Sequence, residues 1–178
     1  STGGVYGDHG GEWVDEGADC RPASRRARMR VDAEAAWQAL GRRRGLPVAV
    51  MRLGGIYGPG RNAFIKLEEG SAKRIVKPGQ VFSRIHVDDI AGSTALLAEK
   101  RMGGVFNIAD DEPGPPQDVI AFAAGLMELA PPPEIPFEEA EMSPMARSFY
   151  SDNKRISNAR IKDAGYRFIY PNYRTALT

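Results

Sequence analysis

The sequence of 178 residues predicts an α/β fold built on a parallel sheet. Segments rich in β-branched residues alternate with segments of helical spacing, as in strand–helix–strand units. Residues 47–53 form a nearly continuous apolar run, which is typical of a strand buried on both faces of a sheet. The length is sufficient for one compact domain with an apolar core.

Composition narrows the classes of function. The net charge of +1 provides no overall field that would attract nucleic acid or an anionic membrane. No apolar run approaches the ~20 residues that a bilayer crossing needs. Cys20 is the only cysteine, so an internal disulfide is impossible, which suits a cytoplasmic location. Residues 1–7 show no signal peptide and are typical of the middle of a longer chain, so we expect a fragment or a processed product.

Local signals place the elements of the first third of the chain. Ser24 is the expected N-cap of a helix that ends at Gly45, after three arginines that suit the negative end of the helix dipole. The glycines after residue 53 predict a turn. In order, we expect a strand end at 1–6, a loop at 7–23, a helix at 24–44, a strand at 47–53 and a turn at 54–60.

The remaining elements follow from hydrophobic spacing and from prolines. We expect a helix capped by Asp88 or Asp89, with an inward face of Ile90, Ala91, Thr94, Leu97 and Ala98. The other expected elements are short helices at 63–69 and 173–177, helices at 117–129 and 154–164, strands at 74–76, 82–87, 105–108 and 166–170, a stiff proline spacer at 131–133 and an irregular segment at 134–150.

Four segments, taken in order, resemble the extended short-chain dehydrogenases/reductases. Ser1-Thr2-Gly3-Gly4-Val5-Tyr6-Gly7-Asp8 resembles the strand end that presents their active-site Ser or Thr. The segment from Arg52 to Gly60 resembles their Arg-x-x-Asn-x-Tyr-Gly-Pro-Gly motif. His86-Val87-Asp88-Asp89-Ile90-Ala91 and Val105-Phe106-Asn107-Ile108 resemble two further motifs of the superfamily. The tail, with 143–145 and 153–157, resembles an atypical subgroup that is described as NAD-dependent epimerase/dehydratase-like.

The resemblance implies a Rossmann-type doubly wound parallel sheet, of which this chain would hold only the second half. That half would occupy residues 1–109, and residues 110–178 would form a smaller α+β substrate region. NAD or NADP would need the N-terminal half, whose Gly-rich turn holds the pyrophosphate at a helix N-terminus. The pattern Gly55-x-x-Gly58-x-Gly60 is not that fingerprint and is better interpreted as a turn.

The superfamily's usual acid/base pair is missing. In relatives a Tyr exchanges the proton, and a Lys four residues later lowers its pKa. The resemblance places Arg26 at the Tyr position and Arg30 at the Lys position. No Tyr lies between Tyr6 and Tyr57, and no Lys precedes Lys66, so no shift of the alignment restores the pair. Arginine stays protonated and cannot act as a base.

The resemblance also implies a set of site residues. Thr2 would be the active-site hydroxyl, and its alternative role is a bond to nearby backbone. His86 would contact substrate or, as the favoured alternative, hold a structural place before a helix. The implied catalytic residues are Thr2, Arg26 and Arg30, the cofactor-binding residues are Thr2, Leu53, Gly54 and Gly55, and the substrate-binding residues are Tyr57, Arg84 and His86.

Several clusters have a plain structural interpretation beside the functional one. The arginines of the helix at 24–44 could bind a nucleotide phosphate, but a solvated face fits them better, and they lack the interleaved aromatic residues of a nucleic-acid site. His9 and Asp8 form no metal-ligand cluster. Met142, Met145, Phe149 and Tyr150 could line a substrate pocket or pack the smaller region.

The sequence therefore supports two alternative functions. The first is an NAD(P)-binding epimerase/dehydratase-like or reductase-like enzyme with an atypical active site, acting on a small molecule such as a nucleotide sugar. The second is a non-catalytic nucleotide-sensing or scaffold protein on the same fold. In either case we expect no nucleic-acid or membrane partner and no metal. The missing half, or a second copy in a homodimer, would complete the exposed sheet edge.

Overall fold

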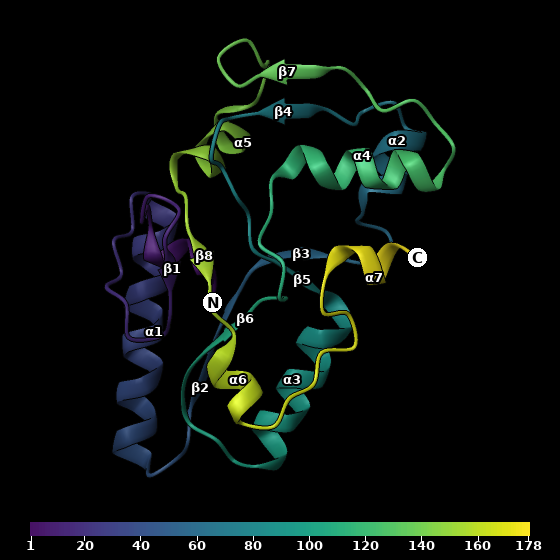
Figure 1. Cartoon of the computed structure of the whole chain (residues 1–178). Coiled ribbons are helices and arrows are strands. Elements are labelled where there is room, and N and C mark those ends of the chain that lie inside the picture. The colour runs from purple at the N-terminus through teal and green to yellow at the C-terminus, as the bar shows by residue number, and fades with distance from the viewer.

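The computed structural model describes residues 1–178 and has the predicted α/β architecture (Figure 1). Its strands are β1 (Trp13–Val14), β2 (Ala49–Leu53), β3 (Gly55–Tyr57), β4 (Arg74–Val76), β5 (Arg84–His86), β6 (Gly104–Ile108), β7 (Glu134–Pro136) and β8 (Arg155–Ile156). Its α-helices are α1 (Arg25–Arg44), α2 (Ala63–Glu68), α3 (Val87–Glu99), α4 (Pro116–Leu126), α5 (Pro144–Ser148), α6 (Ala159–Asp163) and α7 (Tyr173–Leu177). Two 3-10 helices complete it, η1 (Gly3–Tyr6) and η2 (Phe149–Ser151).

Every named strand pair is parallel, which confirms the predicted parallel α/β class. The pairs are β1–β8, β2–β6, β3–β5 and β4–β7. The β2–β6 pair runs in register from Ala49↔Gly104 to Leu53↔Ile108, and an isolated parallel bridge joins Thr2 to Leu53. The N-terminal segment therefore meets β2 at the carboxyl end of that strand.

The elements form a lower and an upper group (Figure 1). β2 and β6 lie between α1 on one side and α3 and α6 on the other, and β4, β7, α2 and α4 lie above them. The main apolar cluster joins the lower elements through Ile85, Leu97, Phe106, Ile108, Ile161 and Tyr166. A second cluster packs the N-terminal segment on β8 through Val5, Tyr6, Val14, Ala109 and Ile156. The proposed domain division at residue 109 stays a prediction.

The ends of α1 confirm the local signals in the sequence. The Ser24 side chain accepts a hydrogen bond from the Ala27 amide at 3.1 Å, and Gly45 ends the helix in the left-handed conformation, with φ of 62°. An N-cap of this kind satisfies one of the amides that a helix start leaves free.

Replacing the cap should weaken the fold measurably. We expect Ser24→Ala to lower the free energy of unfolding by about 1 kcal/mol, because the Ala27 amide loses its acceptor. Urea denaturation measures this difference. Ser71→Ala is the control, since the Ser71 hydroxyl is exposed and its bonds are long, at 3.4 and 3.5 Å. Equal stability of the two variants would show that the cap contributes nothing.

Several sequence-based expectations for elements were wrong. The turn expected at 54–60 contains β3, and the irregular segment at 134–150 contains β7, α5 and most of η2. The helix expected at 154–164 is instead β8 followed by α6, and residues 166–170 form no strand. The expected cap of α3 was also wrong: His86 is its N-cap, and its buried residues are Asp89, Ser93 and Leu97. For β3, β7 and β8, pairing with a distant strand overrides the local pattern.

Candidate functional site

Thr2 lies where open α/β sheets bind ligands, outside the carboxyl ends of parallel strands. Its backbone is extended, and its Oγ1 accepts a hydrogen bond from the Gly4 amide at 3.2 Å, so Thr2 caps η1. The side chain is half-buried. Because the hydroxyl acts here as an acceptor, its own proton is left to donate to a ligand. The structural and the catalytic interpretation of Thr2 are therefore compatible.

A buried ion pair holds the segment around Thr2 against α1. The Arg52 Nη2 and Glu34 Oε2 atoms are 2.8 Å apart, and the two side chains are 8% and 7% exposed. Arg52 Nε adds bonds to the same carboxylate at 3.2 and 3.3 Å. The Ser1 hydroxyl donates to Glu34 Oε1 at 2.5 Å. Since Arg52 is on β2 and Glu34 is on α1, the pair fixes the strand, the helix and the start of the chain relative to one another.

Tyr6 extends this network to β6. The Arg52 guanidinium lies 4.8 Å from the centre of the Tyr6 ring, and the Tyr6 hydroxyl donates to Asn107 Oδ1 at 2.7 Å. Burial raises the pKa of Tyr6, and the residue is fully buried. Tyr6 is thus a structural phenol and does not supply the missing proton carrier.

Arg26 and Arg30 lie on the first turns of α1 and are exposed. α1 packs against η1, which Thr2 caps, but neither guanidinium makes a hydrogen bond to Thr2. Neither guanidinium can accept a proton at neutral pH.

The glycines after β2 serve chain packing. The Gly54 amide donates to the Ile108 carbonyl, and the Gly55 amide donates to the Ser83 carbonyl, both at 2.9 Å. A Cβ on Gly54 would lie 3.0 Å from the Ser83 carbonyl oxygen. These amides are engaged, so they are not free to bind a phosphate. The Gly58 and Arg61 backbones bond each other, which agrees with a turn at that point.

Tyr57 and His86 are neighbours, but both are turned into the fold. Their ring centroids are 5.3 Å apart in an edge-to-face arrangement, and His86 is 5% exposed. His86 Nδ1 accepts from the Asp88 amide, as a cap of α3. The Tyr57 hydroxyl is buried without a hydrogen-bond partner, and burial followed by the charge of Asp110 raises its pKa. Tyr57 is therefore a poor base at neutral pH.

Arg84 is committed to backbone carbonyls. Its guanidinium donates to the Phe82 and Gly114 carbonyls at 3.0 and 3.1 Å and to the Pro115 carbonyl at 3.4 Å. Burial lowers the pKa of Arg84. These bonds tie β5 to the segment before α4, which favours a structural role. A contact of Arg84 with substrate stays a prediction.

Two buried carboxyl groups were missed by the sequence analysis as site elements. Asp89 is fully buried and accepts hydrogen bonds from the Tyr166 hydroxyl and the Ile169 and Tyr170 amides. Asp110 is 1% exposed and lies two residues after Ile108, the buried end of β6. The sequence signal for both residues is an acidic side chain within an apolar segment. Such a side chain is expected to be buried, and a buried charge needs hydrogen-bond partners.

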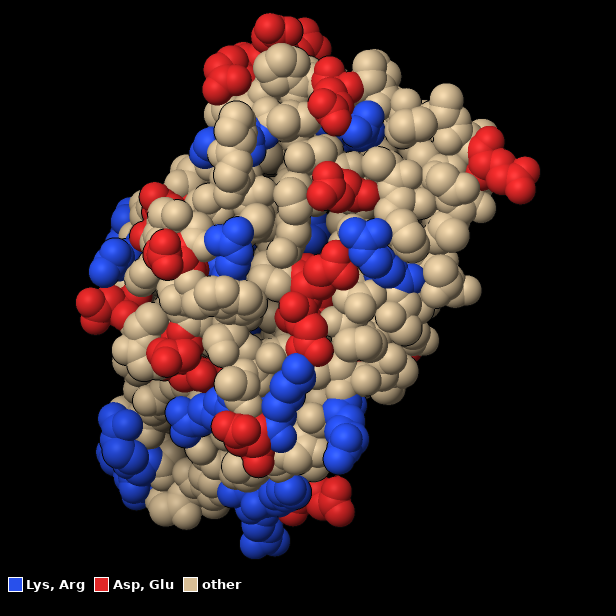
Figure 2. All heavy atoms as spheres, viewed as in Figure 1, with Lys and Arg blue, Asp and Glu red and all other residues tan.

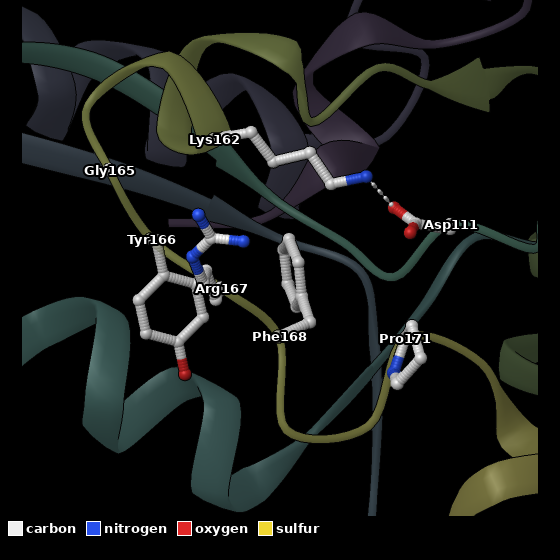
Figure 3. Close-up of a pocket in the computed structure, with 7 residues that line it drawn as sticks. All are labelled: Asp111, Lys162, Gly165, Tyr166, Arg167, Phe168 and Pro171. Atoms are coloured by element: carbon white, nitrogen blue, oxygen red, sulfur yellow. Dashed lines mark hydrogen bonds and ion pairs between the residues drawn. The ribbon is translucent and has the colours of Figure 1, made fainter.

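One surface pocket lies apart from the Thr2 segment (Figure 3). Its volume is about 410 Å³, and it lies between α6 and the segment before α7. Lys162 and Asp111 close one side of it with an ion pair of 2.5 Å. The pocket is lined by Asp111, Lys162, Gly165, Tyr166, Arg167, Phe168 and Pro171. None of these is among the predicted site residues.

Neither the surface charge nor the arrangement of possible metal-binding side chains indicates a further site. On the face shown in Figure 2, basic and acidic side chains are interspersed, in agreement with the net charge of +1. No group of three or more His, Cys, Asp or Glu side chains is placed to hold a metal ion. None of the helices combines the length and the apolar composition that a membrane crossing requires.

Solved structures provide the comparison with known proteins. A functionally unknown conserved protein from Silicibacter pomeroyi is 56% identical, with a TM-score of 0.94 over 99% of this chain and 62% of its own. A protein from Methylobacillus flagellatus, provisionally assigned as an NAD-dependent epimerase/dehydratase, is 29% identical, with a TM-score of 0.73 over 99% of this chain and 59% of its own. The human epimerase family protein SDR39U1, solved with NADPH, is 18% identical, with a TM-score of 0.79, and shows the shared fold.

These neighbours define the class of the protein. No protein-family model matches the chain, and no curated protein sequence matches it. The chain spans about 60% of the length of the solved structures that it matches. Its fold is the Rossmann-type α/β fold of the epimerase/dehydratase-like proteins, in their C-terminal part. Over 99% of its length the chain is similar to the Methylobacillus flagellatus protein, in agreement with the resemblance that the four sequence motifs indicated.

Proposed function

We propose that the protein binds NAD or NADP and acts on a small molecule, with Thr2 as the hydroxyl that holds a substrate oxygen. The observation that carries this proposal is the position of Thr2, which is bridged to Leu53 at the carboxyl end of a parallel strand and retains a free proton. The 29% identical neighbour assigned as an NAD-dependent epimerase/dehydratase supports the cofactor class. A cytoplasmic location and a homodimer belong to the same proposal.

The residues of this chain are suited to contact one end of a bound dinucleotide, but they offer no binding site for its pyrophosphate. The Thr2 hydroxyl is half-exposed, whereas the Gly54 and Gly55 amides are bonded to carbonyls. A pyrophosphate needs free amides at a helix N-terminus. Leu53, Gly54 and Gly55 would therefore contact the cofactor only through their surfaces.

The protein's own groups would orient the substrate without exchanging its proton. A bound nicotinamide ring supplies or accepts a hydride. Thr2 would donate to the substrate oxygen, and the Glu34–Arg52 pair would hold its segment in place. Arg30, and Arg26 on the same helix, could attract an anionic group such as a phosphate. Tyr57, Arg84 and His86 would shape the substrate side from beneath the surface.

Binding and turnover should respond differently to loss of the Thr2 hydroxyl. In the complete protein, we expect NADH or NADPH to bind with micromolar affinity, followed by fluorescence. We expect Thr2→Ala to leave this binding within about threefold and to reduce turnover about 100-fold, a loss typical of one positioned donor. Thr94→Ala is the matched control, since Thr94 is exposed on α3. Absence of binding at millimolar dinucleotide would refute the proposal.

The exposed arginines favour a second candidate, a nucleotide-sensing or scaffold protein without catalysis. Arg26 and Arg30 stand where the resemblance places the proton-exchanging pair, and neither Tyr6 nor Tyr57 takes that role, since both are held inside the fold. This candidate predicts dinucleotide binding without turnover of sugar nucleotides or carbonyl compounds. Turnover that Thr2→Ala abolishes would exclude it.

A further inference from the structure

The hydroxyl of Tyr57 and the carboxyl of Asp110 leave two buried polar atoms without partners. The Tyr57 Oη and Asp110 Oδ2 atoms are both shielded from solvent and make no hydrogen bond. They act on each other, because the charge of Asp110 is, after burial, the main cause that raises the pKa of Tyr57. Such orphaned groups are rare in folded proteins and each requires an explanation.

The bonds that Asp110 does make leave it poorly suited to carry a charge. Its Oδ1 accepts one bond, from the Glu112 amide at 3.2 Å. The cation nearest in the fold, Arg84, has its Nη atoms bonded to three carbonyls. Burying an ionised carboxylate that has one hydrogen bond and no cation of its own costs free energy. Such a group is therefore commonly protonated, which removes its charge.

The surrounding titratable groups are mostly acidic. The hydrogen bond from the Glu112 amide and the charge of Arg84 on β5 favour the ionised carboxyl, whereas the charges of Asp111 and Glu112 oppose it. Burial dominates and raises the pKa of Asp110 to about 7. The further groups that face Tyr57 or Arg84 in this region are Asp89 on α3, Asp118 on α4 and Tyr173 on α7.

We propose that Asp110 is a neutral carboxylic acid in the folded protein below neutral pH, and that it donates its proton to the Tyr57 hydroxyl. A neutral carboxyl can donate to the Tyr57 hydroxyl, which would satisfy both orphaned atoms with a small rotation. Ionisation would instead draw water into this space.

The loop that Asp110 begins is joined to the candidate site. The Asp110 amide donates to the Arg84 carbonyl at 2.7 Å, and the Ile108 carbonyl accepts from Gly54 beside Thr2 and Leu53. Asp110 is thus connected through the backbone to the edge of the sheet where a ligand is expected. This device does not depend on the proposed function.

The direct test is the titration of Asp110 in the wild-type protein. We expect the ¹³Cγ resonance of Asp110 to titrate with a midpoint near pH 7. A midpoint near 4, the ordinary value for Asp, would overturn the proposal. This measurement needs no variant, so it stands even if a substitution prevents folding.

Stability against pH supplies the second test. A pKa that is raised on folding stabilises the protonated folded state, so this contribution is complete at low pH and is lost as pH rises from about 4 to about 7. The unfolding equilibrium constant should increase about tenfold per pH unit from this group between pH 5 and 7. Asp110→Asn should remove that dependence, and Asp111→Asn should keep it. Identical pH profiles for wild type and Asp110→Asn would overturn the proposal.

Discussion

Replacement of Glu34 by Ala should lower the free energy of unfolding by about 4 kcal/mol, because it leaves the Arg52 charge without a partner inside the fold. Both side chains are more than nine-tenths buried, and three nitrogen–oxygen contacts join them. Removing one partner of a buried ion pair destabilises a fold by more than the intact pair stabilises it, because the other charge stays buried without a partner. Urea or thermal unfolding of the protein measures the difference.

A double-mutant cycle separates the pair from its surroundings. We expect Glu34→Leu combined with Arg52→Met to recover most of the lost stability, since no unpaired charge remains. Glu134→Ala is the matched control, because Glu134 pairs with Arg74 at 2.6 Å but is 57% exposed, and surface pairs contribute up to about 1 kcal/mol. Equal losses for Glu34→Ala and Glu134→Ala would show that the buried pair has no special role.

The sequence allowed prediction of those elements whose signals are local. The helix from Arg25 to Arg44 has its cap at Ser24 and its end at Gly45, and both signals act through neighbouring backbone. β2 is visible because a strand covered on both faces is apolar throughout. The parallel class followed from the alternation of such runs with helical segments.

The remaining elements depend on distant partners and carry weak local signals. β8 is a strand of two residues, and it forms because Arg155 and Ile156 pair with Trp13 and Val14 from the other end of the chain. The inward face of α3 was predicted only in part: Ile90 and Leu97 pack in the core as expected, but Asp89 and Ser93 were missed because they are polar. Such polar side chains can be buried without a large loss of stability only where they have hydrogen-bond partners. The hydrophobic periodicity of the sequence does not reveal those partners.

The candidate site was predictable in position and not in detail. The motif around Thr2 and the absence of a Tyr–Lys pair are visible in the residues themselves. The commitment of Arg84 to three carbonyls is not, since Gly114 and Pro115 lie about thirty residues away. The same holds for Asp110, whose importance comes from burial beside Tyr57.

Asp89 is the residue whose loss should most disturb the C-terminal part of the chain. Its Oδ1 accepts from the Tyr166 hydroxyl at 2.8 Å and from the Ile169 amide at 2.7 Å, and its Oδ2 accepts from the Tyr170 amide at 3.0 Å. Gly92 allows the approach, because a Cβ there would lie 2.5 Å from the Tyr166 hydroxyl. One carboxylate on α3 thus holds the whole segment that leads to α7.

We expect Asp89→Ala to cost about 4 kcal/mol, since each bond to a charged acceptor contributes about 1.5–3 kcal/mol and three donors lose their partner together, without full additivity. Hydrogen exchange should show the loss locally, with the Ile169 and Tyr170 amides exchanging faster before the core around Phe106 does. Asp88→Ala is the control, because Asp88 is exposed in the same turn and contributes only through the helix dipole and a long contact with His86 Nδ1 at 3.6 Å, about 1 kcal/mol at most. Retained protection at residues 169 and 170 in Asp89→Ala would show that packing of Tyr166 and Phe168, not this carboxylate, fixes the segment.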